Sequence, residues 1–136
     1  MRKAICDTSP LQYLHQIGFL HLLAEFYAET LIPPAVVSEL ERGKAIGVDL
    51  PDVRELPWLK IQGPEGMDKV LTVADLGAGE KEVLALGLQL PGAVVILDER
   101  LGRLHAEARE TLRTTIVPKN RQAPRLWQEA YPRAVH

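Results

Sequence analysis

Residues 4–11 read Ala-Ile-Cys-Asp-Thr-Ser-Pro-Leu, and this stretch indicates how the fold begins. The three apolar residues predict a buried strand, and Asp7 falls where that strand stops. Thr8 and Ser9 are residue types that cap helices, and Pro10 suits the first position of a helix. Ligands bind at strand ends in open α/β sheets, and a carboxylate buried there is destabilising without a positive partner. The stretch therefore predicts a strand and a helix with an acid at their junction.

The rest of the chain continues this alternation of strands and helices. Residues 93–97 are continuous and apolar, as expected for a strand covered on both faces, and Asp98 follows them. Shorter strands are expected at 30–33, 59–61 and 114–117, and helices at 11–17, 19–27, 34–43, 78–90 and 101–112. Gly43 is expected to end the third helix, and residues 44–58 to form a loop with one helical turn. The pattern predicts an α/β fold, a three-layer sandwich with a mostly parallel central sheet.

The amino-acid composition limits the classes of protein to which this chain can belong. The chain has 136 residues, which suits one domain, with 46% apolar and 25% charged residues and a formal net charge of −2. Such a charge creates no overall basic field toward nucleic acid or membranes. A single cysteine, Cys6, excludes a disulfide framework and fits a reducing compartment. No apolar run reaches the roughly 18 residues of a membrane span, and no signal-peptide pattern is present, so we expect a cytoplasmic protein without membrane contact.

Four acids are candidates for one site. Asp7 and Asp98 both end strands, and the carboxyl ends of parallel strands share one edge of the sheet. Glu39 lies in the third helix among apolar neighbours, and Glu80 lies in the first turn of a later helix. Taken singly, the two Asp residues could be ordinary caps, and the two Glu residues could be solvated surface acids. Together they would need a cation to offset their repulsion, and hard oxygen ligands favour Mg²⁺ or Mn²⁺.

Four segments carry a more specific pattern, in the order 7–11, 32–40, 76–86 and 96–100. They read Asp-Thr-Ser-Pro-Leu, Ile-Pro-Pro-Ala-Val-Val-Ser-Glu-Leu, Leu-Gly-Ala-Gly-Glu-Lys-Glu-Val-Leu-Ala-Leu and Ile-Leu-Asp-Glu-Arg. In order, spacing and context they resemble the PIN domain. The likeness is greatest to a prokaryotic group with a Gly-Glu helix start and a Leu-Asp-Asp-Arg strand end, and it covers residues 3–105.

The resemblance implies an activity and a set of site residues. PIN domains are metal-dependent ribonucleases, and many are VapC-type toxins of toxin–antitoxin pairs. By resemblance, Asp7, Glu39, Glu80 and Asp98 are the catalytic acids, and Ser9 orients the first of them. The Mg²⁺ or Mn²⁺ ligands would be three of these acids, namely Asp7, Glu80 and Asp98.

Further residues and partners follow from the same resemblance. Glu82, Glu99 and Arg100 are secondary candidates, and Arg100 and Arg103 could face a phosphate or pair with acids on the helix surface. The metal would orient a water and lower its pKa for in-line attack on an RNA phosphodiester, with no side-chain nucleophile. Expected partners are RNA, an antitoxin protein and a second copy of the chain.

The C-terminal end departs from the family pattern. Residues 106–118 lack the glycines usual there, and residues 118–136 are interrupted by prolines. We therefore assign residues 1–117 to a PIN-like nuclease domain and 118–136 to a divergent tail. One alternative is a catalytically impaired PIN fold that only binds a partner. Another is a response-regulator receiver, which needs an acid pair at the first strand end, whereas here Thr8 follows Asp7.

Overall fold

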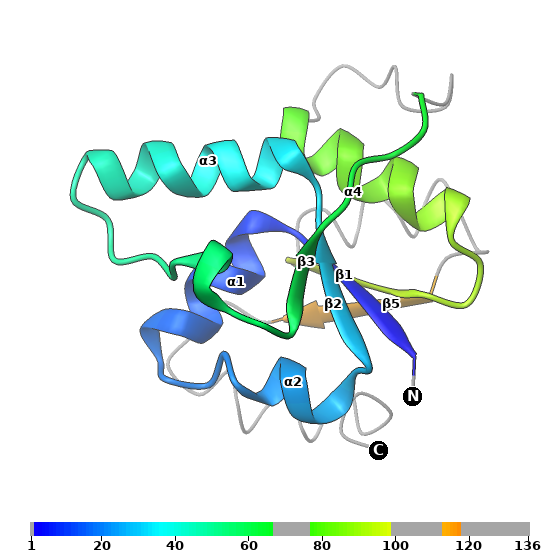
Figure 1. Cartoon of the computed structure of the whole chain (residues 1–136), viewed down its shortest axis with the longest axis horizontal. Helices are drawn as coiled ribbons and strands as arrows, with labels where there is room; N and C mark the ends of the chain where they lie inside the picture. The colour runs from blue at the N-terminus through cyan, green and yellow to red at the C-terminus, as the bar shows by residue number, and fades with distance from the viewer. Residues whose placement is uncertain (1, 67–76, 99–112, 118–136) are drawn as a thin grey trace.

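A computed structural model describes residues 2–66, 77–98 and 113–117 of the chain, the last segment by its backbone only. The helix expected at 101–112 and the tail at 118–136 lie outside the described residues. The described chain forms a parallel sheet with helices on both sides (Figure 1).

The sheet has five strands in the order β3-β2-β1-β4-β5, and every neighbouring pair is parallel. In the register of β1 and β4, Cys6 pairs with Ile96, and the Asp7 N–H donates to the Ile96 carbonyl at 3.2 Å. Asp7 and Asp98 therefore lie at the same carboxyl-terminal edge of two adjacent strands, as the sequence predicts. The strands are β1 (Lys3–Cys6), β2 (Glu29–Ile32), β3 (Leu59–Ile61), β4 (Val94–Asp98) and β5 (Arg113–Val117).

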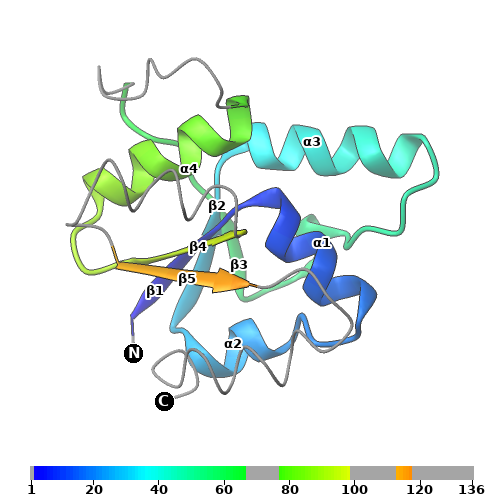
Figure 2. The same cartoon turned by 180° about the vertical axis from the view of Figure 1, so that it is seen from behind.

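Helices cover the two faces of this sheet. In both Figure 1 and Figure 2, α4 lies on one side of the strands and α2 on the other, which confirms the three-layer α/β arrangement. The first turns of α3 and α4 lie side by side in both views. The helices are α1 (Thr8–Gln16), α2 (Leu22–Phe26), α3 (Pro34–Ala45) and α4 (Ala78–Gln89), and a short 3-10 turn, η1, spans Val53–Glu55.

Burial on both faces explains the continuous apolar runs of the central strands. Ala4, Ile5 and Cys6 of β1 are 0% exposed, so side chains pointing to opposite faces are equally covered. The same holds for residues 95–97 of β4. Each fully buried Leu or Ile side chain stabilises the fold by about 1.5–3 kcal/mol relative to an exposed one. The ends of these strands are therefore held firmly in place.

The first helix begins earlier than its residue types indicate. Asp7 is the N-cap of α1, because its carboxylate accepts a hydrogen bond from the Thr8 N–H at 2.8 Å. Pro10 is then the third residue of the helix, where its missing N–H leaves no intrahelical bond unmade. The prediction that Pro10 occupies the first helical position is therefore wrong, and the acid at the junction is itself the cap.

Two further helix boundaries differ from the sequence expectation. Helix α3 runs past Gly43 to Ala45, so Gly43 does not end it. A Cβ on Gly43 would lie 2.5 Å from a Leu50 methyl group, which shows that this glycine makes room for the loop that packs on α3. Helix α2 begins later than expected, at Leu22, because Leu20 and His21 form a turn before it.

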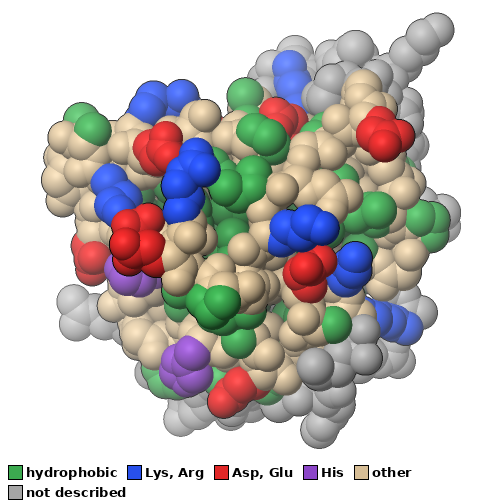
Figure 3. Space-filling model, viewed as in Figure 1, with side chains coloured by type: hydrophobic (Ala, Val, Ile, Leu, Met, Phe, Trp, Pro, Cys, Tyr) green, Lys and Arg blue, Asp and Glu red, His purple; other side chains and the backbone are tan. Residues whose placement is uncertain are grey.

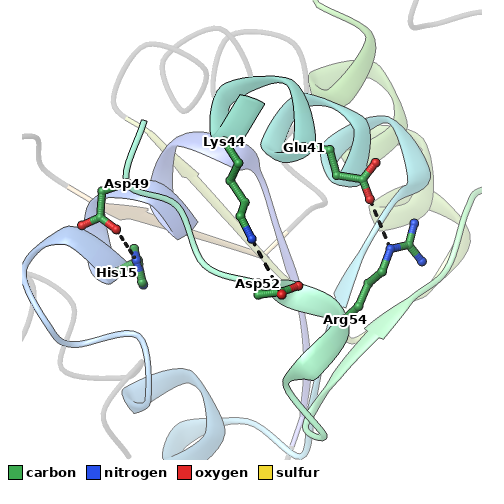
Figure 4. Close-up of polar contacts among 6 residues, drawn as sticks. All are labelled: His15, Glu41, Lys44, Asp49, Asp52 and Arg54. Carbon is green, nitrogen blue, oxygen red and sulfur yellow. Dashed lines mark hydrogen bonds and ion pairs between the residues drawn. The ribbon is translucent and has the colours of Figure 1, made fainter. Parts of the chain in front are cut away.

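Exposed ion pairs tie the segment after α3 to its neighbours (Figure 4). The pairs are Lys44–Asp52 at 3.8 Å and Arg54–Glu41 at 3.1 Å, and a hydrogen bond joins His15 Nε2 and Asp49 Oδ1 at 3.0 Å. Because solvent screens exposed pairs, each contributes about 1 kcal/mol at most. The helical turn expected in this segment is present as η1.

The molecular surface shows no large single-sign field on the face of Figure 3, where Lys and Arg side chains alternate with Asp and Glu. None of the helices in the described part of the chain combines the length and the apolar composition of a membrane span.

Candidate functional site

Asp7 is a buried carboxylate at the end of the central strand. Its side chain is 4% exposed and accepts a hydrogen bond from the Thr8 N–H. Burial, with a further contribution from the charges of Glu80, Glu39 and Asp98, raises the pKa of Asp7 to about 7, against the opposing effect of that hydrogen bond. The three other predicted acids therefore lie near enough to act on Asp7 electrostatically.

Glu39 reaches this region from α3, and both of its carboxylate oxygens have partners. The Thr8 hydroxyl donates to Oε2 at 2.6 Å, and the Gly79 N–H donates to Oε1 at 3.0 Å. Glu39 thereby connects the beginnings of α1 and α4. Its contacts fix the carboxylate at the sheet edge that Asp7 occupies.

Gly79 allows that close approach. A Cβ at this position would lie 2.6 Å from Glu39 Oε1, closer than real Cβ atoms come to another heavy atom, and 3.1 Å from Oε2, which is a tight contact. The residue is buried in the first turn of α4, with the Glu39 carboxylate against its backbone. The glycine at this helix start is therefore needed for the close approach of the Glu39 carboxylate to the backbone, and not for flexibility.

Glu80 and Asp98 complete the group of four. Glu80 lies in the first turn of α4 and accepts a hydrogen bond from the Gly77 N–H at 3.2 Å, an arrangement that suits the helix dipole. Asp98 is the last residue of β4 and is only 6% exposed. We call Asp7, Glu39, Glu80 and Asp98 the acidic cluster.

The donors of the acidic cluster are of the kind that a hard divalent cation takes. All are carboxylate oxygens, and the raised pKa of Asp7 reflects burial and repulsion that a cation would offset. Burial and the Asp7 charge also raise the pKa of the Cys6 thiol well above its usual value, so Cys6 adds no thiolate. Within residues 2–66 and 77–98, no three His, Cys, Asp or Glu side chains already lie at the spacing of a metal site. The cluster fits a cation by its chemistry.

The other predicted residues have different positions. Ser9 is a half-buried residue in the first turn of α1, and its orienting role stays a prediction. Glu82 accepts a hydrogen bond from the Ala35 N–H at 3.1 Å, so one of its oxygens is directed to the start of α3. Glu99, Arg100 and Arg103 lie outside the described residues.

Two residues that contact the acidic cluster were not assigned a role in it from the sequence. From the sequence, Thr8 is only a residue type that caps helices, and Gly79 is only part of the Gly-Glu helix start of the third motif. A small residue directly before the acid of a helix's first turn is the one signal that could have indicated Gly79. Thr8 has no such signal, because its partner Glu39 lies 31 residues away along the chain.

One of three comparisons with known proteins gave a match. A protein-family model of the PIN domain matches residues 3–115, a range that contains all four acids of the cluster. Searches of curated proteins and of solved structures each gave no match.

Proposed function

The chain belongs to the PIN-domain family, and from this premise we propose that it is a divalent-metal-dependent ribonuclease. The PIN domain is a nuclease-type fold, which supports hydrolysis of a phosphodiester. We assign the catalytic role to the acidic cluster, with Mg²⁺ or Mn²⁺ as the cofactor and RNA as the substrate.

One observation carries the proposal. Asp7 is buried at a sheet edge where ligands bind in α/β folds, and burial and three neighbouring acids raise its pKa to about 7. Such an arrangement is destabilising by itself, which argues for a positive ligand rather than for a structural role. The cluster lies within the matched range of the family.

The side chains of this chain would perform distinct tasks. Asp7, Glu80 and Asp98 would hold the cation, and Glu39, fixed by Thr8 and Gly79, would add negative charge beside Asp7. A bound divalent cation supplies Lewis acidity and lowers the pKa of water. The burial of Asp7 and Asp98 limits their exposure to bulk water and so strengthens electrostatic effects at this edge.

The reaction itself is a hydrolysis. The oxygen of a water forms a bond to phosphorus as the bond from phosphorus to the leaving sugar oxygen breaks. The proton lost by the water leaves for solvent, and the leaving oxygen gains one. No side chain of the cluster needs to become covalently attached to the substrate.

RNA cleavage by purified protein tests this function. Wild type is incubated with structured RNA in Mg²⁺ or Mn²⁺ and in EDTA, beside Asp7→Asn. The matched control is Asp49→Asn, an exposed acid paired with His15. Substitution of a residue that only supports a metal ligand lowers activity roughly 10–100-fold. We therefore expect Asp7→Asn to lose 100-fold or more of the cleavage rate and Asp49→Asn to cleave at the wild-type rate. Equal cleavage by wild type and Asp7→Asn, or cleavage in EDTA, would contradict the proposal.

We further propose that the ribonuclease is the toxin of a VapBC-like pair, with an antitoxin protein as its partner. Support comes from the likeness of the four motifs to prokaryotic PIN proteins of that kind. Induced expression in a bacterial host should arrest growth for wild type and Asp49→Asn but not for Asp7→Asn. Growth arrest by all three proteins, or by none, would exclude the toxin role and favour a PIN fold that only binds a partner.

A further inference from the structure

The carboxylate of Glu39 is held by its surroundings before any ligand is considered. Thr8 donates its hydroxyl to one oxygen and Gly79 its backbone N–H to the other, at 2.6 and 3.0 Å. These donors come from the first turns of two different helices, α1 and α4. Hydrogen bonds to a charged carboxylate are stronger and more directional than those between neutral groups.

A second contact joins α3 and α4, with the acid now on α4 and the donor on α3. Glu82 of α4 accepts from the Ala35 N–H in the first turn of α3, while Glu39 of α3 accepts from the Gly79 N–H in the first turn of α4. Each helix therefore contributes one carboxylate that accepts a hydrogen bond at the N-terminus of the other, where the helix dipole is positive. The first turns of α3 and α4 lie side by side in Figures 1 and 2, as this exchange requires.

The inference rests on the proposed function and concerns the same site. We propose that Thr8 and Gly79 are positioning residues, which hold the Glu39 carboxylate beside Asp7 and so prepare the acidic cluster for a divalent cation. They act through Glu39 and need not touch the cation or the RNA. The Thr8 hydroxyl donates one of the two hydrogen bonds to Glu39, and the absence of a Cβ at Gly79 makes room for the other.

The hydroxyl of Thr8 is tested by a matched series of variants. Thr8→Val keeps the side-chain shape and removes the donor, whereas Thr8→Ser keeps the donor. The control is Thr30→Val in β2, whose buried hydroxyl has no hydrogen-bond partner among the described residues. The readouts are the Mn²⁺ dissociation constant by calorimetry, and kcat and KM for RNA.

We expect Thr8→Val to weaken Mn²⁺ binding and lower kcat by roughly 10–100-fold, the range for residues that orient metal ligands. Its KM should change little, because Thr8 acts on the acidic cluster. Thr8→Ser should restore most of both properties, and Thr30→Val should match wild type. A merely structural role would not give rescue by Ser together with an unchanged KM.

Gly79→Ala tests the hydrogen bond from the Gly79 N–H to Glu39. The new Cβ would collide with the Glu39 carboxylate, so this variant should weaken Mn²⁺ binding although alanine favours helix formation. Combining Thr8→Val with Glu39→Gln should lower Mn²⁺ affinity no further than Glu39→Gln does alone. Additive losses would mean that Thr8 does not act through Glu39.

Failure of this inference differs from failure of the proposed function. If Thr8→Val binds Mn²⁺ and cleaves RNA as wild type does, the positioning role is overturned and the ribonuclease remains. If wild type neither cleaves RNA nor binds Mn²⁺, the proposed function fails. In that case, melting temperatures in EDTA show whether the hydrogen bond between Thr8 and Glu39 forms. Additive Tm losses for Thr8→Val and Glu39→Gln would show that it does not.

Discussion

At the scale of single residues, the buried carboxylate of Asp7 makes the stability of the fold depend on pH. Its ordinary pKa is 3.8, and in the folded protein the pKa is raised to about 7, mainly by burial. Between these values the folded chain keeps a proton that the unfolded chain has released. Stability from this group is therefore present at low pH and is lost as pH rises from about 4 to about 7.

Replacement of Asp7 by Asn should remove this pH dependence. In EDTA at pH 8, we expect Asp7→Asn to be more stable than wild type, by at most about 4 kcal/mol at 1.36 kcal/mol per pKa unit. The difference should shrink toward zero as pH falls to about 4, because wild-type Asp7 is then protonated. Urea unfolding at several pH values measures this, with Asp49→Asn as the control. A wild type as stable as Asp7→Asn at pH 8 would show that burial of the Asp7 carboxylate does not destabilise the fold.

The sequence predicts some of these residues for clear physical reasons. Asp7 and Asp98 follow apolar runs, so their place at strand ends can be predicted, as can the burial of Cys6. The partnership of Thr8 with Glu39 cannot, because it depends on how α1 and α3 lie relative to each other. A single sequence shows periodicity along one element but not the distance between two side chains on different elements.

At the scale of elements, the start of α3 depends on an acid from α4. Pro33, the N-cap of α3, gives no side-chain hydrogen bond to the helix, and the Glu82 carboxylate accepts from the Ala35 N–H instead. We expect Glu82→Ala to destabilise the protein by about 1 kcal/mol, as loss of a cap does. Glu82→Gln, which keeps an acceptor oxygen, should cost less.

Chemical denaturation compares these variants with Glu41→Ala. Glu41 lies on α3 and pairs with Arg54 at the exposed surface, so its removal should change the free energy of unfolding by about 0.5 kcal/mol or less. Similar losses for Glu41→Ala and Glu82→Ala would mean that the Glu82 contact adds nothing beyond a surface pair.

The end of α1 depends on backbone conformation. Gly18 has φ of +79°, and nothing lies within 4 Å of a Cβ built there, so a side chain would meet strain but no collision. We expect Gly18→Ala to destabilise the fold by about 1–2 kcal/mol, and Gly18→Asn by less, because Asn tolerates left-handed geometry better. Thermal unfolding of the two variants checks this order. Equal melting temperatures for wild type and Gly18→Ala would contradict it.

Element types could be predicted better than element ends. The first helix is expected at 11–17, and Gly18 does lie just beyond α1. Gly43 lies inside α3, because a glycine there makes room for Leu50 and does not form a turn. Both glycines follow amphipathic helical runs, and the sequence contains no sign that distinguishes the two uses. The difference arises only when the loop after α3 folds back on the helix.

At the scale of the whole molecule, the parallel sheet brings the acidic cluster together. β1 and β4 are neighbours in the sheet although they are separated in the sequence by α1, α2, β2, α3, η1, β3 and α4. Their two acids therefore meet only when the central crossovers have formed. The family pattern predicts this convergence, since it specifies order and spacing, whereas the closing hydrogen bonds of Glu39 require the folded arrangement.

Folding of the whole chain should accordingly be coupled to a divalent cation. A ligand that binds only the folded state adds about 2.7 kcal/mol at one hundred times its dissociation constant. We expect Mg²⁺ to raise the melting temperature, more at pH 8 than at pH 5.5, because the proton on Asp7 competes with the cation below about pH 7. EDTA should reverse the gain, NaCl of equal ionic strength should not reproduce it, and Asp98→Asn should abolish it while Asp49→Asn keeps it. A Mg²⁺ effect that is equal at both pH values, or that survives in Asp98→Asn, would place the cation elsewhere on the molecule.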